Sequence, residues 1–375
     1  MPKLFSTTFL NLSLRQQLSA LFRARMSLLR AMISYSGICV KILALRILHP
    51  KKTYIGVLLA QHLGDIVAAE PIIGGLHEKY PDAEIFWIVR KPFADLLINH
   101  PQISGLFIEE NLFVSIWLTK LSPFTRFFNL HLGDIRFESN LYSVLENPTA
   151  AELHITKENY YNNLSLLGIF SALSDLKVAD RAPKLYVGDT QYPLPFGGNY
   201  WIMHRKSTDI AREWKDEHWI QLIDYLTQEH GVNIVEIGTD SPLTCSNSQF
   251  LSLVGQTSIL ETAVLIRSAG FFLGIDSGPT HMANAFEIPA FIICGQFVNF
   301  KRYMSYSGAY TNKNIANIYF NPSGSAHELS YLDVLEPLQN TLKATFEREK
   351  GRLIVASRTD SGMLSKTASA CVFIE

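Results

Sequence analysis

The sequence predicts an α/β protein of two domains, each built on a mostly parallel sheet. Short apolar runs, typical of buried strands, alternate with segments of helical periodicity, and the alternation occurs in two series along the chain. A segment rich in proline and glycine, 189–199, lies between the two series and is typical of a domain boundary. The length of 375 residues fits two domains of ~100–200 residues each.

The first series predicts an N-terminal domain over 53–195. Its strands are expected at Tyr54–Ala60, Glu84–Val89 and Gly105–Ile108. Its helices are expected at Val67–Lys79, ending before Pro81, and at Leu164–Phe170.

The second series predicts a C-terminal domain over 196–345. Its strands are expected at Tyr200–Met203, Asn233–Ile237, Phe271–Ile275 and Ala290–Cys294. Its helices are expected at Glu217–Glu229, Leu260–Ser268 and Leu329–Glu347. The end of the chain is rich in Ser and Thr without a clear period, so 346–375 are expected to form a poorly ordered tail.

The N-terminal arm, residues 1–52, is basic and apolar. It lacks Asp and Glu, and its basic residues are Lys3, Arg15, Arg23, Arg25, Arg30, Lys41, Arg46, Lys51 and Lys52. Apolar residues recur at helical spacing, at Leu18, Leu21, Phe22, Met26, Leu28, Leu29 and Met32. The pattern predicts a basic amphipathic helix on an anionic membrane surface. A helix packed on the protein itself and a transit peptide remain alternatives. A membrane-spanning helix is not expected, because from residue 31 on the longest uncharged stretch is Ala31–Val40, well short of ~20 residues.

Charge and cysteine usage exclude several classes of protein. The formal net charge of −1 gives no overall field that would attract nucleic acid. The four cysteines lack metal or redox spacing, which is typical of a reduced, cytoplasmic setting. No Asp-x-Asp pair, zinc-type His/Cys cluster, dinucleotide-binding glycine motif or P-loop occurs. We therefore expect neither a metal nor a cofactor.

The most informative segment lies between a predicted strand and a predicted helix, from Gly274 to His281. Ser277 and Gly278 suit a helix N-cap, and Pro279 suits the first helical turn. A helix start favours phosphate through its N–H groups and dipole, and open parallel sheets bind ligands at the carboxyl ends of their strands. The segment therefore predicts a phosphate site, although a lone histidine is more often structural.

Two further segments place polar residues before a helix. Gln61–Asp65 follows a strand, and Asp65 fits either a helix cap or a general base that opens on a cleft. His204–Trp219 is a basic, tryptophan-containing loop that fits either a charged surface loop or a diphosphate site. Trp214 and Trp219 are expected to be packing residues.

In content and order the three segments resemble those of glycosyltransferase family 9, the ADP-heptose:lipopolysaccharide heptosyltransferase family. The resemblance covers about Tyr54 to Phe300. It implies the GT-B architecture, with two Rossmann-like domains facing across a cleft, here carrying a basic N-terminal helical arm. It also implies an inverting transfer of heptose from ADP-heptose to a lipopolysaccharide-core or other lipid-linked saccharide. The enzyme would be cytoplasmic and peripheral on the inner face of the inner membrane.

The resemblance also implies roles for single residues. Asp65 would be the catalytic base. The donor would be bound by Ser207, Thr208, Arg212, Lys215, Thr239, Asp240, Asp276, Ser277, Gly278 and His281. Basic groups suited to the phosphates and carboxylates of the acceptor are Arg90 and Arg136. Arg212 stands where family members have a lysine, and its planar guanidinium changes the geometry of phosphate binding while keeping the charge.

Two other functions remain open at this point. One is the same reaction class with another sugar or nucleotide, for which the Arg212 and Asp240 positions leave room. The other is a non-catalytic relative that binds a nucleotide or a glycan, which binding without turnover would identify.

Overall fold

The computed structural model describes residues 13–138, 141–160, 165–189, 191–197, 199–298, 300 and 305–359, with the backbone alone at 134–138, 141–142 and 349–359. The chain divides into two compact units, Met1–Gly188 and Asp189–Glu375. The predicted boundary after residue 195 therefore falls a few residues late. Both units are α/β, as the alternation of strands and helices predicted.

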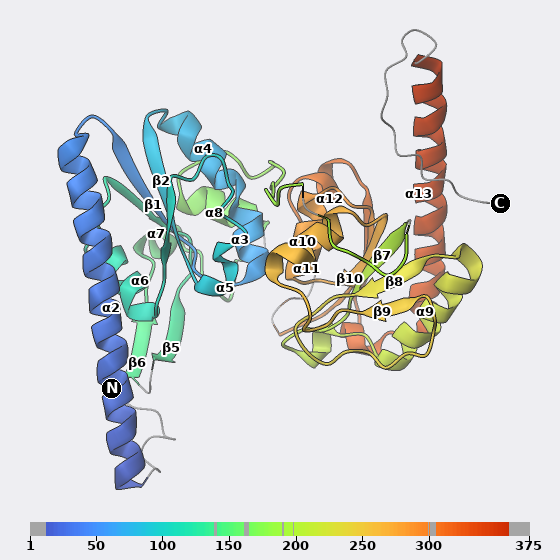
Figure 1. Ribbon diagram of the computed structural model, residues 1–375, viewed down its shortest axis with the longest axis horizontal. Helices are drawn as coiled ribbons and strands as arrows, with labels where there is room; N and C mark the ends of the chain where they lie inside the picture. Colours follow the sequence, from blue (N-terminus) through green and yellow to red (C-terminus); the bar gives the residue numbers. More distant parts are fainter. Residues whose placement is uncertain are drawn as a thin grey trace. The chain divides into compact units, whose positions relative to one another are not determined.

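The first unit contains a parallel sheet of four strands in the order β3-β2-β1-β4 (Figure 1). The strands are β1 (Thr53–Leu58), β2 (Ala83–Val89), β3 (Gly105–Ile108) and β4 (Arg126–Asn129). A separate antiparallel pair is formed by β5 (Asp134–Glu138) and β6 (Leu141–Leu145). The helices are α2 (Leu14–Leu48), α3 (Leu63–Ala69), α4 (Pro71–Lys79), α5 (Lys91–Ala94), α6 (Leu112–Lys120), α7 (Pro148–Glu152) and α8 (Leu166–Leu173).

The single helix predicted at Val67–Lys79 is in fact two helices, α3 and α4, that meet at Glu70. Pro71 begins the second helix, because proline lacks an N–H and its ring clashes with the preceding turn of a continuous helix. The carboxylate of Glu70 is buried and accepts hydrogen bonds from His100 Nε2 at 2.8 Å and from the Lys184 backbone N–H at 2.8 Å. The break is therefore fixed on both sides by contacts within the unit.

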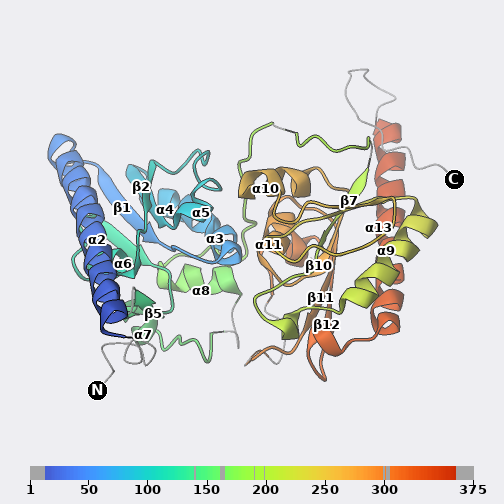
Figure 2. The same cartoon turned by 60° about the horizontal axis from the view of Figure 1, so that its bottom comes forward.

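The second unit contains a parallel sheet of six strands in the order β12-β11-β10-β7-β8-β9. The strands are β7 (Tyr200–His204), β8 (Asn233–Glu236), β9 (Phe250–Ser252), β10 (Phe271–Ile275), β11 (Ala290–Gly295) and β12 (Ala316–Asn321). The helices are η1 (Ile210–Arg212), α9 (Asp216–His230), α10 (Ile259–Arg267), α11 (Gly278–Ala285), α12 (Ala309–Asn312), η2 (Ala326–Glu328) and α13 (Tyr331–Thr359). Helices α9 and α13 cover one face of this sheet, and α10 and α11 lie on the other (Figure 2). Trp214 and Trp219 are buried in its core, as predicted.

Helix α13 is longer than predicted. It continues through Thr359 and therefore overlaps the segment 346–375 that was expected to be a poorly ordered tail. It packs on α9 and β12, so its first turns belong to the core of the second unit. Residues 360–375 lie outside the part of the chain that the structure describes.

In each parallel sheet the order in which the chain adds strands reverses at one point, so that later strands lie on the other side of the first strand. In the second unit this switch point lies between β7 and β10, because β8 and β9 follow on one side and β11 and β12 on the other. In the first unit it lies between β1 and β4. Such points leave a crevice at the carboxyl ends of the strands, where ligands bind in open α/β sheets. The predicted donor and base segments follow β10 and β1, next to these two points.

Helix α2 packs along the first unit instead of standing apart as an arm. Its buried residues are Ala20, Ala24, Ala31, Ile38 and Ile42. Asn111 Nδ2 donates to the carbonyl of Ser27 at 2.9 Å, and Tyr35 Oη donates to the carbonyl of Leu121 at 2.6 Å. By length and composition alone α2 is long and apolar enough to cross a membrane, which corrects the expectation drawn from its uncharged stretches.

Candidate functional site

The donor segment folds as predicted, with one difference at its serine. β10 ends at Ile275, Ser277 occupies the N-cap of α11, and Pro279 lies in the first turn. The Ser277 hydroxyl makes no capping hydrogen bond to the helix. It lies instead 3.0 Å from Nδ1 of His204, at the end of β7. This contact joins the two strands across the switch point of the second unit.

Asp276 is the centre of the candidate site. Arg212 Nη2 donates to both the backbone carbonyl and the carboxylate of Asp276, and the distance to Oδ2 is 3.0 Å. Tyr306 Oη donates to the other carboxylate oxygen. The ring of His281 lies 4.8 Å from the Tyr306 ring. The guanidinium of Arg212 also lies over the ring of Phe297, 5.2 Å from its centroid.

Burial keeps the two histidines of this cluster neutral. Removal from water, together with the nearby cations Arg205 and Arg212, lowers the pKa of His204 to about 4. Burial also lowers the pKa of His281 to about 4, against the opposing effect of Asp276. A neutral imidazole has one N–H donor and one acceptor nitrogen, so His204 can position the Ser277 hydroxyl without adding charge.

We expect the protein to become less stable as the pH is lowered, because of His204. Its pKa is lowered from 6.5 to about 4 in the fold, so the unfolded state binds more protons between these values. The free energy of unfolding therefore decreases as the pH falls from 6.5 towards 4, by at most about 3 kcal/mol for this residue.

Urea unfolding of the wild type and His204→Asn between pH 7.5 and 4.5 measures this effect. The variant should lose part of the pH dependence between pH 6.5 and 4.5, whereas His49→Asn, at an exposed position, should keep it. Equal pH dependence in the wild type and His204→Asn would refute the assignment.

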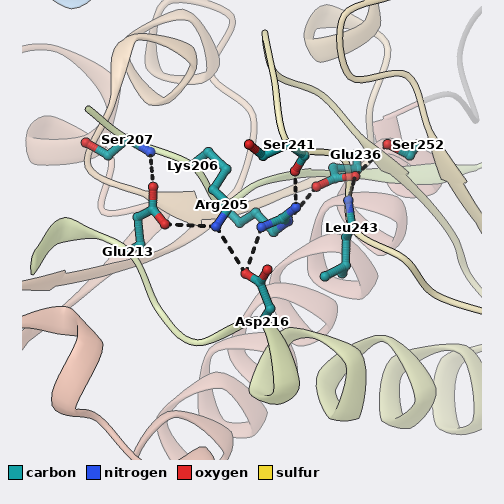
Figure 3. A network of polar contacts seen from close by, with 9 residues as sticks. All are labelled: Arg205, Lys206, Ser207, Glu213, Asp216, Glu236, Ser241, Leu243 and Ser252. Carbon is teal, nitrogen blue, oxygen red and sulfur yellow. Dashed lines mark hydrogen bonds and ion pairs between the residues drawn. The ribbon is translucent and has the colours of Figure 1, made fainter. Parts of the chain in front are cut away.

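A buried polar network behind this site ties three loops together (Figure 3). Arg205 follows β7, and its side chain is 2% exposed. Its Nε donates to Glu236 Oε1 at 2.6 Å, its Nη1 donates to Asp216 Oδ1 at 2.7 Å, and its Nη2 donates to the carbonyl of Ser241. Glu236, at the end of β8, is 1% exposed and also accepts from the Leu243 N–H at 3.0 Å and the Ser252 hydroxyl at 2.6 Å. The network fixes the start of α9 and the loop after β8 relative to β7.

The donor loop after β7 is held by an adjacent pair of contacts in the same figure. Glu213 is buried and accepts from the Ser207 N–H at 2.8 Å and from Lys206 Nζ at 3.0 Å (Figure 3). Asp209 accepts from the Ala211 N–H at 2.9 Å and so caps η1, the turn that carries Arg212. These contacts set the direction of the Arg212 side chain.

The predicted donor residues are only partly gathered by the structure. Arg212, Asp276, Ser277, Gly278 and His281 lie together at the switch point. Ser207 lies on the loop after β7, where its backbone N–H is bound by Glu213. No hydrogen bond or ion pair among the described residues connects Asp276 with four others, which are Thr208, Lys215, Thr239 and Asp240. Thr239 and Asp240 are exposed on the loop after β8, and their nucleoside role stays a prediction.

Several residues of this cluster carried no recognisable signal in the sequence. Tyr306 lies 30 residues beyond Asp276, in a segment without a motif, and only the fold brings the two together. His204 follows the predicted strand Tyr200–Met203 and begins the basic loop, but it was not singled out as a site residue. Arg205 followed it as one charge among several in a basic loop.

In the first unit, Asp65 lies in the first turn of α3. That helix begins at Leu63, so Asp65 is not the cap of a helix that begins at Ile66. The N-cap position belongs to His62, whose φ of 61° and ψ of 120° are rare for a residue with a side chain. Strained backbone of this kind is concentrated at functional sites, where the surrounding structure maintains it. The turn therefore favours a functional role for Asp65.

A cluster of polar side chains lies at the switch point of the first unit. The Ala60 N–H donates to Nε2 of His131 at 3.0 Å, which joins the segments that follow β1 and β4. Asn147 Nδ2 donates to the carbonyls of Asn129 and His131, both at 2.7 Å. These buried groups position the chain immediately before the Asp65 turn. None of them was singled out in the sequence.

Of the two predicted acceptor residues, the structure describes Arg90 in full and Arg136 only by its backbone. The Arg90 N–H donates to the carbonyl of Ala60 at 2.9 Å, so this exposed residue lies beside the chain that leads to Asp65. Arg136 lies in β5, where the structure describes the backbone alone, and its role stays a prediction. The described part of the chain contains no group of three or more His, Cys, Asp or Glu placed to hold a metal ion.

Known proteins resemble this chain in sequence and in fold. A family model described as glycosyltransferase family 9 (heptosyltransferase) matches residues 174–307. Lipopolysaccharide heptosyltransferase 3 of Escherichia coli is 22% identical over 281 residues, which cover 62% of this chain and 80% of that protein. The structure of E. coli ADP-heptose LPS heptosyltransferase II matches with a TM-score of 0.56 and 17% identity, over 79% of this chain and 99% of that one. E. coli heptosyltransferase WaaC with ADP-2-deoxy-2-fluoro heptose matches with a TM-score of 0.54 and 12% identity, over 77% and 99% of the two chains.

The matches confirm the fold class predicted for the chain, two Rossmann-like α/β domains of the GT-B class. The matched segment 174–307 contains two of the three motifs, the Arg212 loop and the Asp276 turn, whereas the Asp65 turn lies outside it. The chain therefore resembles glycosyltransferase family 9, the heptosyltransferase family, in sequence over residues 174–307 and in fold over most of its length.

Proposed function

We propose that this enzyme transfers heptose from ADP-heptose, with inversion, to a lipopolysaccharide core or another lipid-linked saccharide. The reaction would take place on the cytoplasmic face of the inner membrane and would need no metal ion. The observation that carries the proposal is the cluster of Arg212, Asp276 and Ser277 at the switch point of the second unit. E. coli proteins of similar sequence or fold are described as lipopolysaccharide or ADP-heptose heptosyltransferases, which supports the choice of donor and acceptor.

The diphosphate of the donor would be bound by Arg212 and by the start of α11. Both hydrogen bonds from Arg212 to Asp276 come from Nη2. Arginine has five N–H donors, so the N–H groups on Nη1 and Nε remain for phosphate oxygens. The N–H groups and dipole of the α11 start would add to the attraction. Fixed positive charge at this place stabilises the negative charge that develops on the leaving diphosphate.

Asp276 has two roles in this proposal. Its carboxylate holds the Arg212 guanidinium and the Tyr306 hydroxyl, so it sets the position of the cation before the donor binds. Preorganised charge is what gives such a site its catalytic effect, because little reorganisation is needed during the reaction. Ser277, positioned by neutral His204, would donate its hydroxyl to the same phosphates.

Calorimetric titration with ADP, UDP, GDP and CMP in a chelator-containing buffer tests the donor site. We expect selective ADP binding, and about 10- to 100-fold weaker binding in Arg212→Ala, because hydrogen bonds to charged groups contribute about 1.5–3 kcal/mol. Arg348→Ala is the matched control, since it removes an exposed arginine from α13 of the same unit. Selective UDP or GDP binding would keep the enzyme class and change the sugar. Equal affinity in the wild type and Arg212→Ala would contradict the assignment of this residue.

A further inference from the structure

We propose that the outward face of helix α2 is a docking surface for an anionic lipid bilayer, on which the helix lies in the plane of the membrane. The surface consists of Leu18, Phe22, Leu29, Ile33, Val40 and Ile47. Their side chains are between 48% and 78% exposed, although all six are large and apolar. An apolar surface of this extent on a soluble protein marks an interaction site.

The geometry of the helix separates this surface from the face that packs on the protein. At about 100° per residue, the buried positions from Ala20 to Ile42 fall within a sector of about 40°. The six exposed side chains fall within about 40° of the opposite direction. Helix α2 therefore has two apolar faces, a narrow one made of three alanines and two isoleucines against the first unit and a broad one directed outward. Figures 1 and 2 both show the helix running along the first unit, next to α6.

Charge complementarity identifies the occupant as a negatively charged surface. Helix α2 carries Arg15, Arg23, Arg25, Arg30, Lys41 and Arg46 and has no acidic residue. Lys41 and Arg46 contact the first unit, through the rings of Phe86 and Phe107 and the carbonyl of Pro123. The other four lie in the N-terminal half of the helix. Basic residues close to an anionic leaflet each strengthen binding to it.

A pocket beside these arginines is suited to a lipid phosphate. It has a volume of about 470 Å³ and lies between α2 and the Glu110–Asn111 turn. Arg23, Arg30 and Phe22 line its α2 side. Glu110 also lines the pocket and reduces its positive charge. The pocket therefore combines two guanidinium groups with an apolar edge, which matches the boundary between headgroups and acyl chains.

The contacts of α2 exclude a membrane-spanning arrangement of the folded chain. A helix that crosses the hydrocarbon core needs ~20 residues surrounded by lipid. In this chain Ala31, Ile38 and Ile42 belong to the same buried core as Tyr54 and Leu58 of β1. Insertion across the bilayer would remove these side chains from that core. An in-plane helix keeps the core and still buries the outward face.

Sedimentation of the full chain with vesicles tests the proposal, without nucleotide or acceptor, so the result is independent of the donor assignment. Vesicles of phosphatidylcholine alone are compared with vesicles that also contain phosphatidylglycerol. We expect binding to the anionic vesicles that weakens with salt. The triple variant Leu18→Ser, Leu29→Ser and Ile33→Ser should bind at least about tenfold more weakly, because less apolar surface is buried in the membrane.

The matched control removes three exposed apolar side chains from other surfaces, with Ile98→Ser, Leu153→Ser and Leu332→Ser, and should bind as the wild type does. Loss of binding in both triple variants, or no vesicle binding by the wild type, overturns the proposal. Light scattering, which measures the oligomeric state, can also overturn the proposal. If the wild type is a dimer that the α2 variant converts to a monomer, without vesicle binding, the face is an interface between two copies.

Discussion

Replacing Asp65 by asparagine is expected to lower kcat by about 10²- to 10⁴-fold while leaving ADP affinity unchanged. The size of the loss is typical of removing a general acid or base. Asparagine keeps the shape of the side chain and loses only the ability to take a proton, so the fold of α3 should be preserved. ADP affinity should stay constant because the proposed donor site belongs to the second unit and Asp65 to the first.

The position of Asp65 gives the physical reason for this choice. It is half-buried in the first turn of α3, which follows the carboxyl end of β1 at the switch point of the first sheet. His62 keeps a rare backbone conformation at the N-cap, and the Ala60 N–H is fixed by His131. Because the backbone before Asp65 is fixed, its side chain has a defined direction. A general base needs such a direction, since it must accept a proton from one particular hydroxyl.

The chain contains a matched control for this experiment. The tripeptide Leu-Gly-Asp occurs a second time at Leu132–Asp134, where Asp134 begins β5 of the antiparallel pair. Asp134→Asn should retain wild-type turnover in an assay with ADP-heptose and an acceptor. Full turnover in Asp65→Asn would remove the base assignment, and an equal loss in both variants would mean that the tripeptide acts through structure alone.

Seven of the ten strands in the two sheets were predicted, because each is an apolar run in the sequence. Gly105–Ile108 and Phe271–Ile275 occur with the predicted bounds, and the others differ by one or two residues at an end. The strands β4 to β6 were missed, because Arg126–Asn129 and the pair that follows carry polar and aromatic residues without a continuous apolar run. The two edge strands of the second sheet, β9 and β12, were missed as well, and their residues are only half-buried. Their place is set by pairing partners distant in sequence, such as β1 for β4.

In the candidate site, too, the residues that are close together in sequence were predictable and the contacts between distant segments were not. Asp276, Ser277 and Gly278 were predictable because a strand end, a cap and a helix start follow one another within a few residues. The Asp276–Tyr306 and Ser277–His204 contacts were not, because they join segments 30 and 73 residues apart. Helix α2 illustrates a further limit. Its sequence predicts an apolar helix, but which apolar face packs inward is decided by contacts with residues distant in sequence, such as those of Ile38 and Ile42 in the core that contains Tyr54.

Replacing Arg205 by methionine is expected to destabilise the second unit by about 3–5 kcal/mol. The guanidinium is 2% exposed and compensates the charge of Glu236, which is 1% exposed. Removal of one partner leaves a buried carboxylate without its opposite charge, and this accounts for most of the loss. The hydrogen bonds to Glu236 from Leu243 and Ser252 remain, but they do not replace the charge.

The change can be measured by urea unfolding, followed by tryptophan fluorescence. Three of the five tryptophans, Trp201, Trp214 and Trp219, lie in the core of the second unit and therefore report on its unfolding. The matched control is Lys313→Met, which breaks the exposed pair of Lys313 and Glu287, where both side chains are about half exposed. That variant should lose less than about 1 kcal/mol, since exposed ion pairs contribute little.

A second variant separates the charge effect from a simple packing defect. In Arg205→Met with Glu236→Gln the buried carboxylate is absent, so a large part of the stability should return. If the double variant is as unstable as Arg205→Met, the loss comes from packing or from the Ser241 contact and not from the buried charge.

The ADP affinity of the double variant then reports on function. Arg205 ties the loop after β8 to β7 through the Ser241 carbonyl. If Thr239 and Asp240 on that loop contact the nucleoside, affinity should stay weaker than in the wild type even where stability is restored.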